Sequence, residues 1–95
     1  AHDDAYLSPA HGRDTVTISV HHNASLPFQE YFADAESIFR DFGGRPHWGK
    51  KHTAPPHDIA RAYQRRDRFL EIRKQFDPAR VFASAYLEEL LGLED

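Results

Sequence analysis

The stretch FGGRPHWGKKHT, residues 42–53, places the only tryptophan of the chain, two histidines and two lysines directly after a Gly-Gly pair. A core segment would not carry so many polar side chains, and a loop without a role would not need a tryptophan. The stretch therefore either packs onto the core through Trp48 or binds something. Pro55 and Pro56 follow it, so we expect irregular backbone up to this point.

The segment before this stretch, residues 28–42, is predicted to be a helix. Its apolar residues recur at helical spacing, and its charged residues fall on the opposite side. Ser25 or its neighbour can cap the start, Pro27 suits the first turn, and Gly43-Gly44 ends the helix. The apolar positions are Phe28, Tyr31, Phe32, Ala35, Ile38, Phe39 and Phe42.

Three shorter helices are predicted after the stretch. Residues 57–63 form the first, which breaks near Gln64, and residues 65–76 form an amphipathic second. A turn around Pro78 leads to a last helix over residues 85–92, capped by Ser84 and closed by Gly92.

One strand is predicted, over TVTISVHH at residues 15–22. Its β-branched residues alternate, with Val16, Ile18 and Val20 on one side and Ser19 and His21 on the other. Residues 1–13 contain turn signals and are predicted to be a loop. The expected fold class is therefore α+β, with one or more antiparallel strands and about four helices. A lone strand cannot form a sheet, so its partner must come from residues 1–7 or from chain outside this sequence.

Composition limits the class of protein. Ninety-five residues make one domain, residues 1–95, and the net charge of −3 gives no basic face for nucleic acid. The apolar runs are too short to span a membrane. The lack of cysteine excludes disulfides and thiolate metal sites and fits a cytoplasmic protein. The irregular start without methionine indicates a fragment of a longer protein, although removal of an initiator methionine would also explain it.

The histidines do not predict a metal site. His47, His52 and His57 lie five residues apart, which is not the spacing that places two imidazoles on one helix face. The row containing Ser19 and His21 is either the solvent side of an antiparallel sheet, which the pattern favours, or a floor under a polar ligand.

The stretch around Trp48 has two readings from the residues alone. Gly43, Gly44 and Gly49 would let a flat ligand approach the backbone, and the Lys50 ammonium could stabilise negative charge that develops on a ligand. In the other reading Trp48 fills the core, and the lysines are solvated. No nucleophile, base and acid are arranged for hydrolysis.

Three segments, YLSPAHGRDTVTISV, FGGRPHWGKKHT and FDPARVFASAYLEELLG, resemble in this order the C-terminal part of the aldonolactone and alditol oxidases. These flavoproteins of the vanillyl-alcohol oxidase superfamily include D-arabinono-1,4-lactone, L-gulonolactone and xylitol oxidases. The resemblance implies oxidation of a hydroxyl of a polyol or aldonolactone by covalently bound FAD. It also implies that the FAD-binding domain of the parent chain lies upstream. The present segment would belong to the cap domain, whose antiparallel sheet covers the flavin ring.

The resemblance also implies roles for individual residues. Lys50 matches the family lysine that lies at the flavin and the substrate hydroxyls, so it is the expected catalytic, substrate-binding and cofactor-binding residue. His47, in the same His-Trp-x-Lys run, is expected on the cofactor side. Ser19 and His21 fall on strand positions where alditol oxidases use a His and a Thr towards substrate; the changes of type leave the substrate open.

Within the run, Trp48 is the expected packing anchor, and Lys51 and His52 are expected to be solvated neighbours. The segment by itself is expected to be inactive. The alternative is a stand-alone α+β binding or dimerisation module, in which an exposed strand edge pairs with a second copy to give a homodimer.

Overall fold

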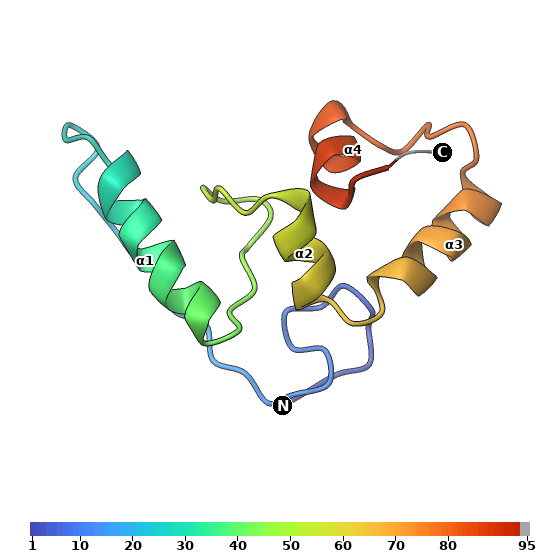
Figure 1. The fold of residues 1–95 in the computed structure, drawn as a ribbon, viewed down its shortest axis with the longest axis horizontal. Helices are drawn as coiled ribbons and strands as arrows, with labels where there is room; N and C mark the ends of the chain where they lie inside the picture. Colours follow the sequence, from blue (N-terminus) through green and yellow to red (C-terminus); the bar gives the residue numbers. More distant parts are fainter. Residues whose placement is uncertain (94–95) are drawn as a thin grey trace.

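The computed structural model describes residues 1–93 and contains four helices along this part of the chain (Figure 1). Their number and positions confirm the helices predicted from the sequence. The predicted start of the first helix is wrong, because its N-cap is Phe28, which makes no side-chain capping bond, and neither Ser25 nor Pro27 belongs to the helix. They are α1 (Gln29–Asp41), α2 (Pro56–Ala62), α3 (Arg66–Phe76) and α4 (Ala85–Leu91).

The core lies where α2 meets α4. Ile59 and Tyr63, from α2 and the residue that follows it, and Leu90 of α4 are almost fully buried and contact one another. So few buried side chains supply only a modest hydrophobic driving force, as in other very short domains. Hydrogen bonds and ion pairs between segments therefore contribute much of the stability of this fold. Partly buried side chains surround this centre: Leu7, Trp48, Ala54, Ala62 and Leu87.

Local sequence signals explain where α4 begins and ends. The Ser84 hydroxyl accepts a hydrogen bond from the Leu87 amide, so Ser84 is the N-cap that the sequence predicts. Gly92 has φ of 62°, and the Leu93 amide donates to the Glu88 carbonyl at 3.0 Å, which is a Schellman ending. Arg66 of α3 donates to the Leu91 carbonyl and ties α3 to this end.

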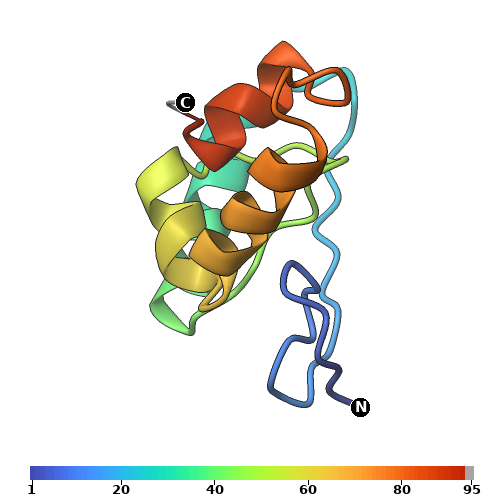
Figure 2. The same ribbon diagram turned by 90° about the vertical axis from the view of Figure 1, so that its right-hand side faces the viewer.

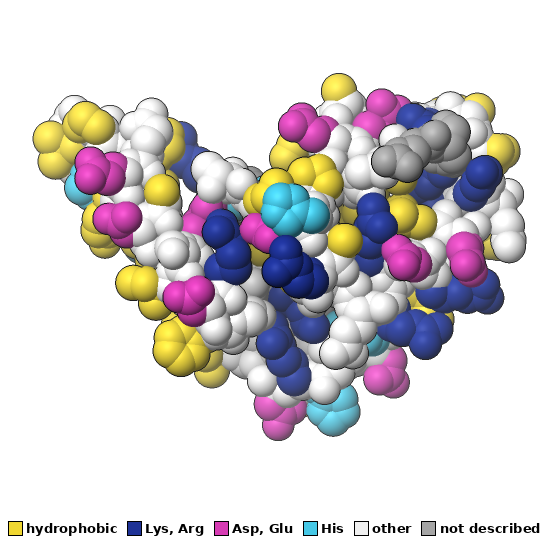
Figure 3. All heavy atoms as spheres, in the orientation of Figure 1, with side chains coloured by type: hydrophobic (Ala, Val, Ile, Leu, Met, Phe, Trp, Pro, Cys, Tyr) yellow, Lys and Arg dark blue, Asp and Glu magenta, His cyan; other side chains and the backbone are white. Residues whose placement is uncertain are grey.

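Helix α1 stands apart from the other three helices, and the surface is hollowed beside it (Figures 1 and 3). It buries none of its residues; Ile38 is 58% exposed, and the adjoining Phe42 is 86% exposed. Within residues 1–93, two polar residue pairs join α1 to other segments. Arg40 pairs with Asp58 at 3.2 Å, and Glu36 accepts two hydrogen bonds from Thr53.

The predicted strand at residues 15–22 is wrong, and so is the α+β class with an antiparallel sheet. Residues 1–93 contain no strand, only an isolated bridge between Asp3 and His11. The segment runs without secondary structure between the N-terminal loop and α1, and Val16 and Ile18 are 80% and 63% exposed. Alternating β-branched residues favour a strand, but a strand also requires a partner for its backbone hydrogen bonds. The residues described here offer none.

Arg45 joins three segments of the chain. Its Nε donates to the Ala62 carbonyl at 2.8 Å, while Nη1 donates to the Pro9 and His11 carbonyls at 3.0 Å each. The guanidinium also lies over the Tyr63 ring, 5.3 Å from its centroid. Burial, with a smaller effect from the charge of Arg13, lowers the pKa of Arg45. This side chain holds the N-terminal loop, which lies next to the junction of α2 and α3 in Figure 1 and extends below the helices in Figure 2.

We predict that Arg45→Lys lowers the free energy of unfolding by about 1–3 kcal/mol, because an ammonium cannot reach both groups of carbonyls and also stack on Tyr63. Chemical unfolding followed by Trp48 fluorescence measures this loss. Arg61→Lys is the matched control, since Arg61 is 78% exposed and makes one long ion pair, 3.7 Å from Asp58. Equal losses in the two variants would contradict the role given to Arg45.

Candidate functional site

The residues 47–50 form a tight turn that carries Lys50. The Lys50 amide donates to the His47 carbonyl at 3.0 Å, and the Gly49 amide donates to Nδ1 of the His47 ring at 3.0 Å. A Cβ on Gly49 would lie 3.1 Å from the His47 ring, so glycine suits this close approach. The turn therefore has a defined backbone conformation, fixed by its own hydrogen bonds.

Trp48 attaches this turn to the core. Its ring meets the Tyr63 ring edge-on, with centroids 5.6 Å apart and planes at 77°, and it packs against the cluster around Ile59 and Leu90. This confirms the prediction that Trp48 is the packing anchor. The indole thus holds one side of the turn to the protein, while Lys50 lies on the exposed side.

The Lys50 ammonium makes no hydrogen bond, ion pair or ring contact within residues 1–93, and its side chain is exposed. The neighbouring Lys51 differs, because its ammonium lies 3.9 Å from the centre of the Phe28 ring. Lys50 is therefore a cation on an ordered turn whose charge is available to a ligand. His47 is also exposed, and its Nδ1 is engaged within the turn, which leaves Nε2 as the ring atom that could contact a cofactor.

His52 and Tyr86 form a feature that the sequence reasoning missed. Nε2 of His52 lies 2.7 Å from the Tyr86 hydroxyl, which in turn donates to the Trp48 carbonyl at 2.6 Å. Nδ1 of His52 accepts from the Ala54 amide at 3.2 Å. The prediction that His52 is merely a solvated neighbour is wrong. No local pattern could have paired two residues 34 positions apart, although both lie in segments that carry the family resemblance.

The other two predicted substrate residues are not joined to this turn. Ser19 and His21 lie in the exposed segment before α1, and neither makes a hydrogen bond, ion pair or ring contact among the described residues. The adjacent His22 stacks on Tyr31 of α1, with centroids 4.8 Å apart. The roles given to Ser19 and His21 therefore remain predictions.

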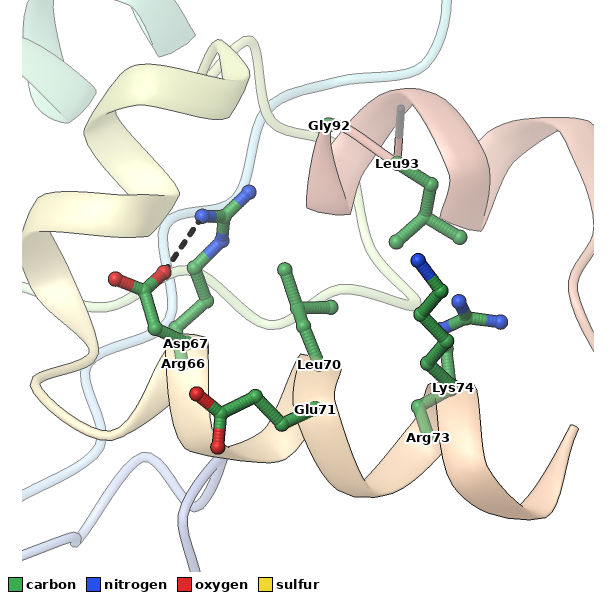
Figure 4. A pocket seen from close by; sticks show the side chains of 8 residues that line it. All are labelled: Arg66, Asp67, Leu70, Glu71, Arg73, Lys74, Gly92 and Leu93. Carbon is green, nitrogen blue, oxygen red and sulfur yellow. Dashed lines mark hydrogen bonds and ion pairs between the residues drawn. The ribbon is translucent and has the colours of Figure 1, made fainter. Parts of the chain in front are cut away.

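Two shallow surface hollows lie near α4. One, of about 310 Å³, borders the His52 and Tyr86 pair. The other, of about 460 Å³, lies between α3 and the end of α4, where Leu70, Lys74 and Leu93 face one another beside the Arg66–Asp67 ion pair (Figure 4). None of the predicted site residues lines the larger hollow.

Two kinds of feature are absent from residues 1–93. No three histidine, aspartate or glutamate side chains gather there in a group that could hold a metal ion. No helix in the same range is long and apolar enough to cross a membrane.

The sequence of this chain is similar to a known protein family and to several characterised relatives. A family model described as D-arabinono-1,4-lactone oxidase matches residues 1–90. L-gulono-1,4-lactone dehydrogenase of Mycobacterium tuberculosis (strain CDC 1551 / Oshkosh) is 45% identical over 92 residues, covering 97% of this chain and 22% of that protein. L-gulonolactone oxidase of Mus musculus is 34% identical, covering 93% and 21%. Alditol oxidase of a Streptomyces species is 33% identical, covering 96% and 22%. The chain thus spans about a fifth of the length of these relatives.

The buried Tyr63, on which Trp48 packs, predicts how the stability of the chain depends on pH. Burial raises the pKa of the Tyr63 hydroxyl above its ordinary 10.0, against smaller opposing effects from Trp48 and Arg45. A raised pKa means that folding favours the neutral phenol. This contribution is complete below the ordinary tyrosine pKa and is lost as pH rises through the higher value of the folded state.

We therefore expect the wild-type chain to lose stability relative to Tyr63→Phe above about pH 10, with a constant difference at lower pH. Urea unfolding of both proteins across this range, with tyrosinate absorbance recorded in parallel, measures the effect. A stability difference that does not change with pH would contradict the burial of this hydroxyl.

Proposed function

The chain belongs to the D-arabinono-1,4-lactone oxidase family, and on this basis we propose that it is the C-terminal, substrate-facing segment of an FAD-dependent oxidoreductase. The proposed reaction oxidises a hydroxyl of a sugar alcohol or aldonolactone. Relatives named as lactone dehydrogenase, lactone oxidase and alditol oxidase support this reaction class. Because the chain spans about a fifth of those proteins, we propose that the FAD-binding domain belongs to the same parent chain and that this segment alone is inactive.

The proposal rests on one observation, that Lys50 combines a fixed backbone with an ammonium group that no described residue contacts. Its backbone is fixed by the turn and by the Trp48 anchor, while its ammonium has no partner within residues 1–93. A positioned cation can donate a hydrogen bond to the oxygen of a substrate hydroxyl and stabilise partial negative charge that develops on that oxygen. Because the backbone is already fixed, little further ordering is needed when substrate binds.

The turn also offers polar groups to one edge of a flavin. The Lys50 ammonium and Nε2 of His47 both belong to exposed side chains, and Nδ1 of His47 is already bonded within the turn. When bound, FAD would supply the hydride-acceptor chemistry at its N5, with oxygen or another acceptor as the final oxidant. We propose that Lys50 and His47 contact this edge and that the rest of the cofactor is held by the FAD-binding domain.

Ser19 and His21 complete the proposed substrate contacts. Their hydroxyl and imidazole groups have no partners among the described residues, so both are available to bond the hydroxyls of a polyol or aldonolactone. We propose that they orient the substrate while Lys50 acts on the reacting hydroxyl.

The Lys50 ammonium will act strongly only where water is excluded, because charge interactions weaken in a high dielectric medium. The exposed side of the turn must therefore be covered in the full-length enzyme. The apolar residues of α1 and of the segment before it are exposed and could form the surface on which a covering domain packs. Large exposed apolar surfaces on soluble proteins usually mark interfaces. We propose the FAD-binding domain of the same chain as the partner.

We predict that Lys50→Ala in the full-length enzyme reduces kcat by about tenfold or more and leaves the bound flavin content near normal. Steady-state kinetics and the flavin absorbance of the purified protein measure the two quantities. Lys51→Ala is the matched control, since it removes the adjacent ammonium, which lies on Phe28. Unchanged turnover in Lys50→Ala, or an equal loss in both variants, would refute the role of Lys50.

We also predict that the purified segment binds the separately produced FAD-binding domain and restores flavin-dependent oxidation of a polyol or aldonolactone. A titration with activity and sedimentation as readouts measures this. A stable homodimer of the segment that ignores the flavin domain would instead support a stand-alone dimerisation module.

A further inference from the structure

The contacts around Tyr86 determine where its single hydroxyl proton lies. The Trp48 carbonyl, 2.6 Å away, can only accept, so the Tyr86 proton must point to it. The remaining neighbour of the hydroxyl oxygen is Nε2 of His52, at 2.7 Å. Because the hydroxyl proton is already committed, Nε2 must carry a proton and donate. An unprotonated Nε2 would set two lone pairs against each other at this distance.

The other ring nitrogen of His52 gives the same answer independently. The Ala54 amide donates to Nδ1 at 3.2 Å, so Nδ1 must hold a lone pair rather than a proton. Only the neutral imidazole protonated at Nε2 satisfies both contacts. The imidazolium form would direct an Nδ1 proton at the Ala54 amide and break that contact.

These hydrogen bonds connect α4 to the turn that carries Lys50. Tyr86 lies in the first turn of α4, and the carbonyl that it holds belongs to Trp48, two residues before Lys50. The Trp48 ring is already fixed against Tyr63, so the residue is held by its side chain on one side and by its carbonyl on the other. Rotation of the following peptide, which would move Lys50, is opposed by the Tyr86 contact.

We propose that His52 and Tyr86 are positioning residues for Lys50. The Nε2-protonated tautomer of His52 holds the Tyr86 hydroxyl on the Trp48 carbonyl, and this fixes the direction in which the Lys50 side chain leaves the turn. The inference rests on the function proposed for Lys50. The two hydrogen bonds from His52 to Tyr86 and from Tyr86 to the Trp48 carbonyl, called the clamp below, can be tested without any activity measurement.

The structural test uses the full-length enzyme and Tyr86→Phe, which removes only the hydroxyl. We expect faster amide hydrogen exchange at Gly49, Lys50 and Ala54 in Tyr86→Phe and in His52→Ala. Tyr31→Phe is the matched control, because Tyr31 and Tyr86 are both 46% exposed and the Tyr31 hydroxyl has no hydrogen-bond partner among the described residues. Exchange rates unchanged from wild type in Tyr86→Phe would overturn the clamp.

The tautomer is tested by selective ¹⁵N labelling of histidine and long-range ¹H–¹⁵N correlation at about pH 8, where histidine is ordinarily neutral. We expect a protonated Nε2 and a bare Nδ1 for His52, with the signal assigned by its loss in His52→Gln. A proton on Nδ1 would overturn the assignment.

The kinetic test asks whether the clamp acts through Lys50. Tyr86→Phe and His52→Ala should each lower kcat by about tenfold with little change in KM, and the double variant should lose no more than either alone. His52→Gln should recover part of the loss, because its amide can still donate to Tyr86. In a Lys50→Ala background Tyr86→Phe should have no further effect.

An equal additional loss in the Lys50→Ala background would show that Tyr86 does not act through Lys50 and would overturn the inference. Failure of the proposed function has a different signature. In that case Lys50→Ala would turn over normally, while the exchange rates at Gly49, Lys50 and Ala54 would still respond to Tyr86→Phe.

Discussion

The arrangement of this chain depends on the contacts that Arg45 makes around the buried Tyr63 ring. One guanidinium bonds to carbonyls of the N-terminal loop and of α2 and covers the ring that Trp48 meets edge-on. Because few side chains are fully buried among residues 1–93, apolar packing alone would leave these segments loosely connected. The charged hydrogen bonds of Arg45 supply directional contacts that a small core cannot, and an arginine can make several at once.

The turn that carries Lys50 follows from that arrangement. It starts two residues after Arg45 and is fixed by Trp48 on the core and by Tyr86 of α4. Three residues after its end, Thr53 bonds to Glu36 of α1. The turn thus combines an ordered backbone with the exposed Lys50 ammonium. This combination suits a residue that must meet a ligand in one direction. It also explains why the tryptophan, the histidines and the lysines occur within one short stretch: some of them hold the turn, and Lys50 is presented by it.

The helices could be predicted from the sequence because their determinants are local. Ser84, Gly92 and the glycine pair after α1 act on backbone groups within a few residues, and apolar spacing identifies the helices between them. The predicted strand failed because its determinant is not local. Residues 15–22 alternate as a strand should, yet their hydrogen-bonding partners would have to lie elsewhere, and residues 1–93 do not provide them. The apolar spacing of α1 correctly predicted a helix, but nothing in that pattern says what would cover its exposed apolar side chains.

The same division holds for the candidate site. By itself the sequence determined the helices, because these depend on residue type and short spacing, and it carried the family resemblance. That resemblance singled out Lys50 as the residue to test, with Trp48 as the expected anchor. Only the tertiary structure decided that Arg45 joins three segments and that His52 and Tyr86 meet across 34 positions. It also decided that Lys51 lies on Phe28 whereas Lys50 has no partner within the described residues. These contacts join residues that are distant in the chain, and their geometry exists only once the helices have packed.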